Sequence, residues 1–516
     1  MYQKKLLLLA CTCGMVLNST AKEENQEAVK RPNLLYIFPD QYRMHALSIW
    51  SNPEYRKALS TVGDPASTPN LDKLAKKGIL FNNVCSTYPV SSPHRGMLMS
   101  GMYPRANGIE NNCHISRTTE LKHDIECLTD VLAKNGYETA YVGKTHWHRT
   151  EALFDKDMNY VGTKESPGGN VMNVYDTYIP EGKSRHSNKY WFQGIKSHYT
   201  SYTYSNRPEL VDGKKDGEVK VHDGFTATHE ADIVIKYLKT KSGERCEGKP
   251  FSIIWSINPP HPPYNKLEDC DIEVFNEYYK NMPVDELLVR DNVKLVNKEG
   301  KTKKKNIELN ARIYFTLVKM VDEEVGRVLD ALEEIGETGN TIVVFTSDYG
   351  EMMGSHGLTG KNKIYDESFL VPYIISYPGV LEHRVENLMM GSVDIMPTML
   401  GLMGLEKSIP ETVAGYDYSD GIVTGDFKKC PKPKSALYLN DKAKGVRTYK
   451  YTYVVSADGT YELYDIESDP YQMKKLSFKD IPASDKKMLK DELGKWLIKA
   501  NDRWCDNKKN KELINY

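Results

Sequence analysis

Four short apolar runs, each followed by residues with reactive or charged side chains, constrain the fold of this chain most strongly. The runs cover residues 33–38, 139–142, 252–257 and 341–346. Segments with helical periodicity separate them, and the longest covers residues 311–334. Apolar runs of this length that alternate with helices are typical of a mostly parallel sheet covered by helices. The sequence therefore predicts an α/β fold.

The residues that follow these runs suggest a functional site. They are Asp40, Lys144 with His146, His261, and Asp348. In open α/β sheets, ligands bind at the carboxyl ends of the strands. Any one of these residues would be ordinary in a surface loop. Their occurrence after every one of the four runs predicts that they meet at one edge of the sheet.

A further helix signal begins at Ser92-Pro93 and ends at Gly101. Ser91 is expected to lie just before this helix, where unpaired amide groups and the helix dipole favour an anion. Residues 155–235 are rich in Tyr, Ser, Gly and Asn without a clear period, and we expect an irregular surface excursion there.

The two ends of the chain differ from its body. Lys4-Lys5, the apolar residues 6–17 and Ser19-Thr20-Ala21 predict a cleaved signal peptide over residues 1–21, and hence a periplasmic or secreted protein. An alternative is a lipoprotein signal that uses Cys11. From about residue 435, short β-like runs predict a smaller C-terminal α+β subdomain with a short antiparallel sheet. We interpret the domains as 31–430 and 435–516.

Composition excludes several classes of protein. A hydrophobic fraction of 40% is enough for a globular core, and a net charge of -1 gives no reason to expect nucleic acid as a partner. No later segment is long and apolar enough for a membrane span. Of nine cysteines, Cys11 and Cys13 precede the predicted cleavage, which leaves seven. Export makes one or two disulfides plausible, while the absence of a Cys-x-x-Cys pair argues against zinc.

An ordered set of motifs resembles the sulfatase family, the formylglycine-dependent type I enzymes of the alkaline-phosphatase-like superfamily. The match runs from about residue 31 to 476. The motifs are Pro32-Asn33-Leu34 to Asp40-Gln41, Thr68-Pro69-Asn70-Leu71, Ser91-x-Pro93-x-Arg95 with Gly101-x-Tyr103-Pro104-Arg105, Gly143-Lys144-Thr145-His146, Asn258-Pro259-Pro260-His261, Ser347-Asp348-Tyr349-Gly350-Glu351, Gly360-Lys361, and Leu463-Tyr464-Asp465.

The resemblance implies a mechanism. In this family the first signature residue, here Ser91, is oxidised to formylglycine, whose hydrate attacks sulfur and later expels sulfate. Arg95 would steady the hydrate, and Lys144 and Lys361 would neutralise sulfate oxygens. His146 is the candidate to accept a proton, and His261 is the candidate acid for the departing alcohol.

The resemblance also implies a divalent-cation site. Asp40, Gln41, Asp348 and one oxygen of the modified Ser91 would be its ligands, and oxygen ligation favours Ca²⁺, with Mg²⁺ as the alternative. Tyr349 stands where relatives usually have Asn or His, so we interpret it as a neighbour of the cation. The missing ligand would be water or His356. For Trp147, His148 and His356, substrate contact and loop packing are both open.

The predicted reaction is hydrolysis of sulfate monoesters, with an O-sulfated carbohydrate as the expected substrate: a glycosaminoglycan, a mucin glycan or an algal glycan. Two alternatives are a phosphate or phosphonate ester hydrolase of the same superfamily and a non-catalytic binder of sulfated glycans. Serine at position 91 resembles sites that a radical S-adenosylmethionine maturation enzyme oxidises, so such an enzyme is an expected partner.

Overall fold

The computed structural model describes residues 30–114, 116–149, 176–195, 198–240, 243–295 and 304–513. The predicted signal peptide and residues 155–175 of the expected excursion lie outside this part of the chain. Within it, none of the helices combines the length and apolar character that a membrane crossing would need.

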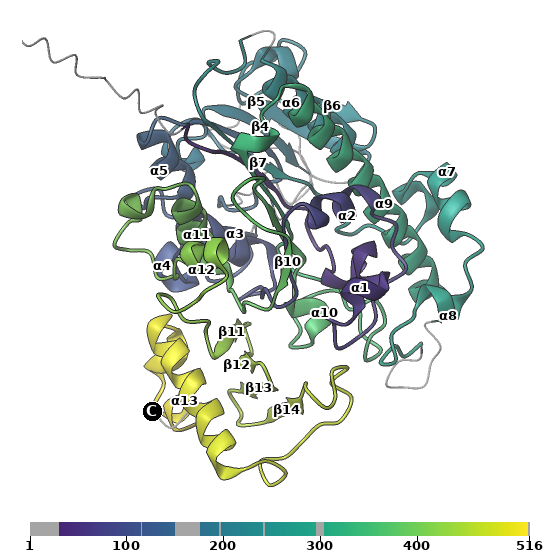
Figure 1. Ribbon diagram of the computed structural model, residues 1–516, viewed down its shortest axis with the longest axis vertical. Coiled ribbons are helices and arrows are strands. Elements are labelled where there is room, and N and C mark those ends of the chain that lie inside the picture. Colours follow the sequence, from purple (N-terminus) through teal and green to yellow (C-terminus); the bar gives the residue numbers. More distant parts are fainter. Residues whose placement is uncertain are drawn as a thin grey trace, which may run out of the picture.

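A large mixed sheet forms the centre of the molecule (Figure 1). Its strands lie in the order β10, β2, β9, β8, β1, β7, β3, β4, β5, β6. Their bounds are β1 Asn33–Ile37, β2 Ile79–Phe81, β3 Glu138–Gly143, β4 Tyr190–Ile195, β5 Thr200–Ser205, β6 Lys220–Asp223, β7 Phe251–Ser256, β8 Thr341–Thr346, β9 Tyr373–Ser376 and β10 Arg384–Glu386. The four runs singled out in the sequence are β8, β1, β7 and β3, which are adjacent and parallel. The predicted α/β fold is therefore confirmed.

Helices cover both faces of this sheet, because successive side chains of a strand point in opposite directions. Leu35 and Ile37 of β1 pack in one core with α2 (Pro69–Lys76), α6 (Thr226–Lys239) and α9 (Lys304–Glu334). Leu34 and Tyr36 pack in the other core with α3 (Ser91–Ser100), α5 (Leu128–Lys134) and α11 (Ile395–Leu402). Figure 1 shows these two groups of helices on opposite sides of the strands. The shorter helices are α1 Pro53–Arg56, α4 Pro104–Asn107, α7 Ile272–Val274, α8 Val284–Leu287, α10 Asp366–Phe369, α12 Ser419–Thr424 and α14 Lys508–Leu513.

Two sequence expectations need correction. The long helix α9 begins at Lys304, before the predicted position 311. The expected irregular excursion is regular over its described part, where β4, β5 and β6 extend the sheet and α6 covers it. Strand β4 is buried along its whole length, and the polar residues of β5 and β6 belong to strands near the sheet edge.

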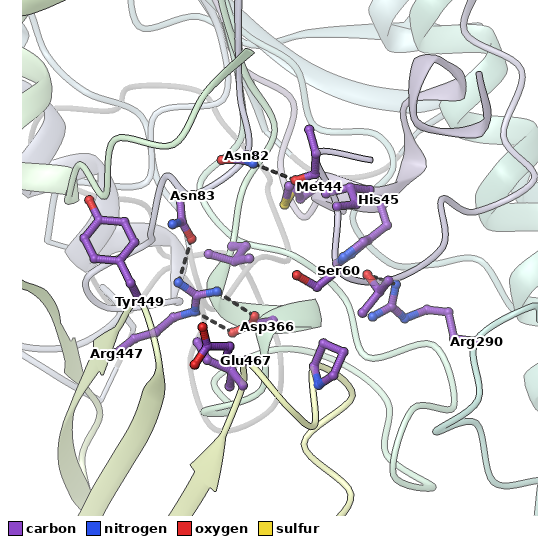
Figure 2. A pocket seen from close by; sticks show the side chains of 16 residues that line it. Met44, His45, Ser60, Asn82, Asn83, Arg290, Asp366, Arg447, Tyr449 and Glu467 are labelled. Atoms are coloured by element: carbon purple, nitrogen blue, oxygen red, sulfur yellow. Dashed lines mark hydrogen bonds and ion pairs between the residues drawn. The ribbon is translucent and has the colours of Figure 1, made fainter. Parts of the chain in front are cut away.

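A second, antiparallel sheet follows in the order β11, β12, β13, β14. Its strands are β11 Ser435–Leu439, β12 Ala443–Thr448, β13 Tyr451–Ser456 and β14 Tyr461–Asp465, and α13 (Ala483–Lys499) packs on it. Arg447 of β12 points toward α10 and forms a buried two-pronged ion pair with Asp366, at 2.8 and 2.9 Å (Figure 2). This pair connects the second sheet to the larger one.

The seven cysteines in the described part of the chain do not form the disulfides that export made plausible. Cys85, Cys113, Cys127, Cys246, Cys270, Cys430 and Cys505 all carry free thiols. Burial raises the pKa of the Cys85 and Cys113 thiols to about 12, so these two are neutral.

Candidate active site

Ser91 lies buried at the start of α3, where it faces the carboxyl end of β1. It is the first residue of the helix, one position further in than the sequence indicated. Its Oγ is 2.8 Å from the Tyr349 hydroxyl and donates to Oδ2 of Asp40 at 3.2 Å. Helix α3 ends at Gly101, whose positive φ of 62° suits glycine.

Asp40 is the centre of a group of cations. Lys144 Nζ lies 2.7 Å from its Oδ2, and Arg95 Nη2 lies 3.2 Å from the same oxygen. Burial acts to raise the pKa of Asp40, but the charges of Lys144, Lys361 and Arg95 outweigh it and hold that pKa well below its usual value. Asp40 is therefore a carboxylate at neutral pH.

Asp348 and Gln41 lie beside Asp40. The Gln41 backbone N–H donates to Asp348 Oδ1 at 2.9 Å, and Gln41 has a positive φ of 62°, which is strained for a side chain of its size. Burial, followed by the charge on Asp40, raises the pKa of Asp348 to about 7. Gln41 Oε1 and Asp348 Oδ2 are both buried without a hydrogen-bond partner among the described residues.

The Gln41 amide is oriented from its other side. Its Nε2 donates to the Glu351 carboxylate, which also accepts a hydrogen bond of 2.9 Å from the Tyr264 hydroxyl. Because the Glu351 carboxylate holds the NH₂ group, the Gln41 carbonyl oxygen points away from it and meets no donor among the residues described. An oxygen without a donor beside two carboxylates is suited to bind a hard cation.

Tyr349, Lys361 and His261 form a chain of polar contacts next to Ser91. Lys361 Nζ lies 2.5 Å from the Tyr349 hydroxyl and 3.0 Å from His261 Nε2, and the Tyr349 hydroxyl donates to Asp40 Oδ1 at 2.5 Å. Burial lowers the pKa of Lys361 to about 8. Burial, followed by the charges of Lys361 and Lys144, lowers the pKa of His261 well below its usual value, so its ring is neutral.

His146 and Arg95 are fixed by carbonyl and hydroxyl groups. His146 has a positive φ of 54°, and its Nε2 lies 3.1 Å from the Cys113 carbonyl oxygen. A carbonyl only accepts, so Nε2 carries the proton and Nδ1 is the basic nitrogen. Arg95 Nη1 donates to Ser256 Oγ at 2.6 Å and to the Lys144 carbonyl at 2.9 Å, and its guanidinium stacks over Phe38.

The predicted catalytic and metal-binding residues thus come together at one edge of the sheet, while the three candidate substrate contacts do not. Trp147 is buried, donates to the Ser184 carbonyl at 3.2 Å and packs against Tyr141, so its role is core packing. The His356 ring stacks on Tyr365 and contacts Asn292 at 3.2 Å, which argues against it as the missing cation ligand. His148 lies near Glu120 and His123.

Several contacts of this site were not predicted. The sequence indicated that Tyr349 departs from its relatives, but not that its hydroxyl reaches Ser91. Glu351 belongs to a motif but has no role in the sequence prediction, although an acidic residue three positions after Asp348 is a usable signal. Cys113 and Ser256 contribute through a carbonyl and a hydroxyl. Neither residue has a sequence pattern that would identify such a contact.

Comparisons with known proteins agree with this geometry. The sulfatase family model matches residues 32–405, and the model of the N-sulphoglucosamine sulphohydrolase C-terminal region matches residues 354–499. An endo-4-O-sulfatase of Bacteroides thetaiotaomicron is 34% identical over 96% of this chain and 97% of its own. An ulvan-active sulfatase of Formosa agariphila is 30% identical over 93% of this chain and 84% of its own.

A solved structure is also similar to this chain over most of its length. It comes from work on the metabolism of multiple glycosaminoglycans by Bacteroides thetaiotaomicron and superposes with a TM-score of 0.84 at 34% identity. The similarity covers 94% of this chain and 100% of that chain. With the match of the family model over most of the chain, these comparisons establish that the protein belongs to the sulfatase family.

Proposed function

We propose that this sulfatase hydrolyses O-sulfate esters of a glycosaminoglycan, with formylglycine made from Ser91 as the nucleophilic group. The observation that carries the proposal is the position of Ser91 at the start of α3, in contact with Asp40 and Tyr349 and beside the cations Lys144 and Lys361. Oxidation of this serine would place an aldehyde where a sulfate monoester meets these positive charges.

The residues present fit a divalent cation. Two carboxylates lie close enough for Asp40 to help raise the pKa of Asp348 to about 7, and neither Gln41 Oε1 nor Asp348 Oδ2, both buried, accepts a hydrogen bond within the described part of the chain. These groups are hard oxygen ligands, which favours Ca²⁺ over a transition metal. We propose that Asp40, Gln41, Asp348 and an oxygen of the modified Ser91 hold this ion. When bound, it would supply positive charge to the reacting oxygens.

Lys144, Lys361 and Arg95 are proposed to balance negative charge. Lys144 and Lys361 would contact sulfate oxygens as point charges. Arg95 already neutralises Asp40 and lies 3.6 Å from Asp348 Oδ2, so its role is to hold these carboxylates in place. Arg95 is buried and the two lysines are partly buried, which strengthens each electrostatic interaction relative to water.

His146 and His261 are proposed to move protons. Nδ1 of His146 is the basic nitrogen, because Nε2 faces a carbonyl. His261 Nε2 accepts from Lys361 in the substrate-free arrangement, so a proton for the departing alcohol is available from the Lys361–His261 pair. A sulfate anion beside this pair would favour its protonated form.

Maturation and location follow from the sequence alone. We propose export directed by residues 1–21 and oxidation of Ser91 by a radical S-adenosylmethionine enzyme before or during export. The similar endo-4-O-sulfatase, together with the similar solved structure from work on glycosaminoglycan metabolism, supports a 4-O-sulfated glycosaminoglycan as the first substrate to test.

The deciding experiment compares protein made with and without a serine-type maturation enzyme. Mass spectrometry of the Ser91 peptide is expected to show formylglycine only in the matured sample, which alone should release sulfate from an aryl sulfate. Defined sulfated oligosaccharides then identify the glycan. Turnover by unmodified serine, or faster cleavage of an aryl phosphate by the matured protein, would overturn the proposal.

A further inference from the structure

A cluster of two histidines and a glutamate lies outside the residues assigned to the reaction. It consists of Glu120 and His123, from the loop before α5, and His148, from the segment after β3. Each residue offers one ligand atom, and these atoms all lie within 4.8 Å of one another. The three come from two segments that a backbone hydrogen bond joins, from Leu121 N to the Trp147 carbonyl at 2.8 Å.

The distances within the cluster suit a small transition-metal ion. One oxygen, Glu120 Oε2, lies 3.6 Å from His148 Nδ1 and 4.0 Å from His123 Nε2. In a tetrahedral zinc site with bonds of about 2.0 to 2.2 Å, ligand atoms are about 3.3 Å apart. Since no two of the three ligand atoms are more than 4.8 Å apart, a closing movement of less than an ångström per side chain would be enough.

The two nitrogens are otherwise unused. His123 Nε2 and His148 Nδ1 are shielded from solvent, and neither makes a hydrogen bond among the residues the structure describes. Burial lowers the pKa of His148 to about 4, which leaves its ring neutral. Neutral imidazole is the form that binds metal ions, and a buried polar atom without a partner is costly.

We propose that Glu120, His123 and His148 form a second metal site, which binds Zn²⁺ or a similar transition-metal ion. Two nitrogen donors and one carboxylate are a ligand set that zinc accepts, with the fourth position left to water or another ligand. This set differs from the oxygen ligands at Asp40 and Asp348, which favour Ca²⁺.

The site has a structural consequence for the reaction centre. His148 follows His146 by two residues, on the segment that also carries Lys144. Trp147 anchors the middle of this segment in the core. A metal ion bound by His148 would therefore link the segment of Lys144 and His146 to the loop of Glu120 and His123. This inference is independent of whether Ser91 is oxidised.

The test is a Co²⁺ titration of the full mature chain, stripped of transition metals and kept in excess Ca²⁺. Co²⁺ replaces zinc and reports tetrahedral ligation through its visible absorption. We expect one equivalent to bind in the wild type and Zn²⁺ to displace it. His123→Ala, His148→Ala and Glu120→Gln should each weaken binding by about 100-fold, since even outer-shell substitutions cost roughly 10- to 100-fold.

The matched control removes two neighbouring histidines elsewhere in the fold, His222 and His229, whose stacked ring centroids are 3.9 Å apart. His222→Ala/His229→Ala should bind Co²⁺ as the wild type does. His123 is partly exposed, so its substitution should not endanger folding, and a Zn²⁺-dependent rise in the unfolding temperature gives a second readout. Absence of a tetrahedral Co²⁺ spectrum in the wild type, or undiminished binding by the His123 and Glu120 variants, would overturn the proposal.

Discussion

Tyr349 is the residue at which this chain differs most informatively from the motif pattern of its family. Its hydroxyl contacts Ser91, Asp40 and Lys361, so a neutral phenol lies between the nucleophile position, a carboxylate and a cation. Burial raises the pKa of Tyr349 well above its usual value, and the nearby carboxylates Asp348 and Asp40 add to the rise. The phenol therefore acts as a hydrogen-bond donor to Asp40 and an acceptor for Lys361.

Tyr349→Phe should lower turnover of an aryl sulfate by about 10- to 100-fold, because it leaves buried charged partners with one hydrogen bond fewer each. The measurement is kcat/KM on matured protein, corrected for the formylglycine content of the Ser91 peptide. Tyr190→Phe is the control, since the Tyr190 hydroxyl is buried without a hydrogen-bond partner among the described residues. Equal activity of the Tyr349 and Tyr190 variants would show that the phenol has no part in turnover.

The residues of the site could be predicted because they follow strands, whereas their contacts could not. Asp40, Lys144, His261 and Asp348 end four apolar runs, and that pattern is visible in the sequence. The contact between Ser91 and the Tyr349 hydroxyl depends on how α3 packs against the ends of β1 and β8. Packing of this kind has no local sequence pattern.

At the scale of elements, continuous apolar runs predicted the central strands, and the polar strands near one edge were missed. β5 and β6 contain Tyr, Thr, Ser and Lys, which suggested an irregular excursion. The same region contains α6, which buries Glu230 against the sheet. The Glu230 carboxyl accepts a hydrogen bond of 3.1 Å from the Trp255 indole of β7.

Glu230 should make the stability of the fold depend on pH. Burial raises its pKa from 4.5 to about 8, so the folded chain keeps a proton that the unfolded chain loses as the pH rises above 4.5. The contribution of Glu230 to the free energy of unfolding is therefore complete below pH 4.5 and decreases until about pH 8, by an amount on the order of a few kcal/mol.

Glu230→Gln removes this titration and keeps an acceptor for Trp255. Its unfolding temperature should be similar to that of the wild type at pH 4.5 and clearly higher than that of the wild type at pH 8.5. Thermal unfolding followed by circular dichroism measures the difference at each pH. Glu333→Gln, at an exposed position of α9, should show no such trend. A difference between wild type and Glu230→Gln that does not grow with pH would contradict the prediction.

At the scale of the whole molecule, the two sheets are not independent. Val90, which directly precedes α3, and Met97 of α3 pack in one core with residues of β11 to β14 and α13. The helix that begins with Ser91 is therefore supported by the C-terminal sheet. A change in sequence character near residue 435 predicted that sheet, but a core shared by distant segments is set by tertiary packing.

The Arg447–Asp366 ion pair is a buried polar link between the second sheet and α10 (Figure 2). Arg447 also donates to the Asn83 side chain at 2.6 Å. Asp366 begins α10, five residues after Lys361. A buried carboxylate that loses its paired cation is strongly destabilising, by about 3–5 kcal/mol.

Arg447→Ala should therefore lower the free energy of unfolding by about this amount, because Asp366 stays buried without its partner. It should also reduce sulfatase activity in protein that is still folded, since α10 adjoins the segment of Lys361. The control is Arg503→Ala, which breaks the exposed ion pair between Arg503 and Glu110. This pair also joins the C-terminal region to the rest of the chain, but because it is exposed, its loss should change the free energy of unfolding little. Urea unfolding gives the free energies, and aryl sulfate turnover at low temperature gives the activity. If both variants unfolded alike and kept full activity, the buried link would have no role in coupling the second sheet to the site.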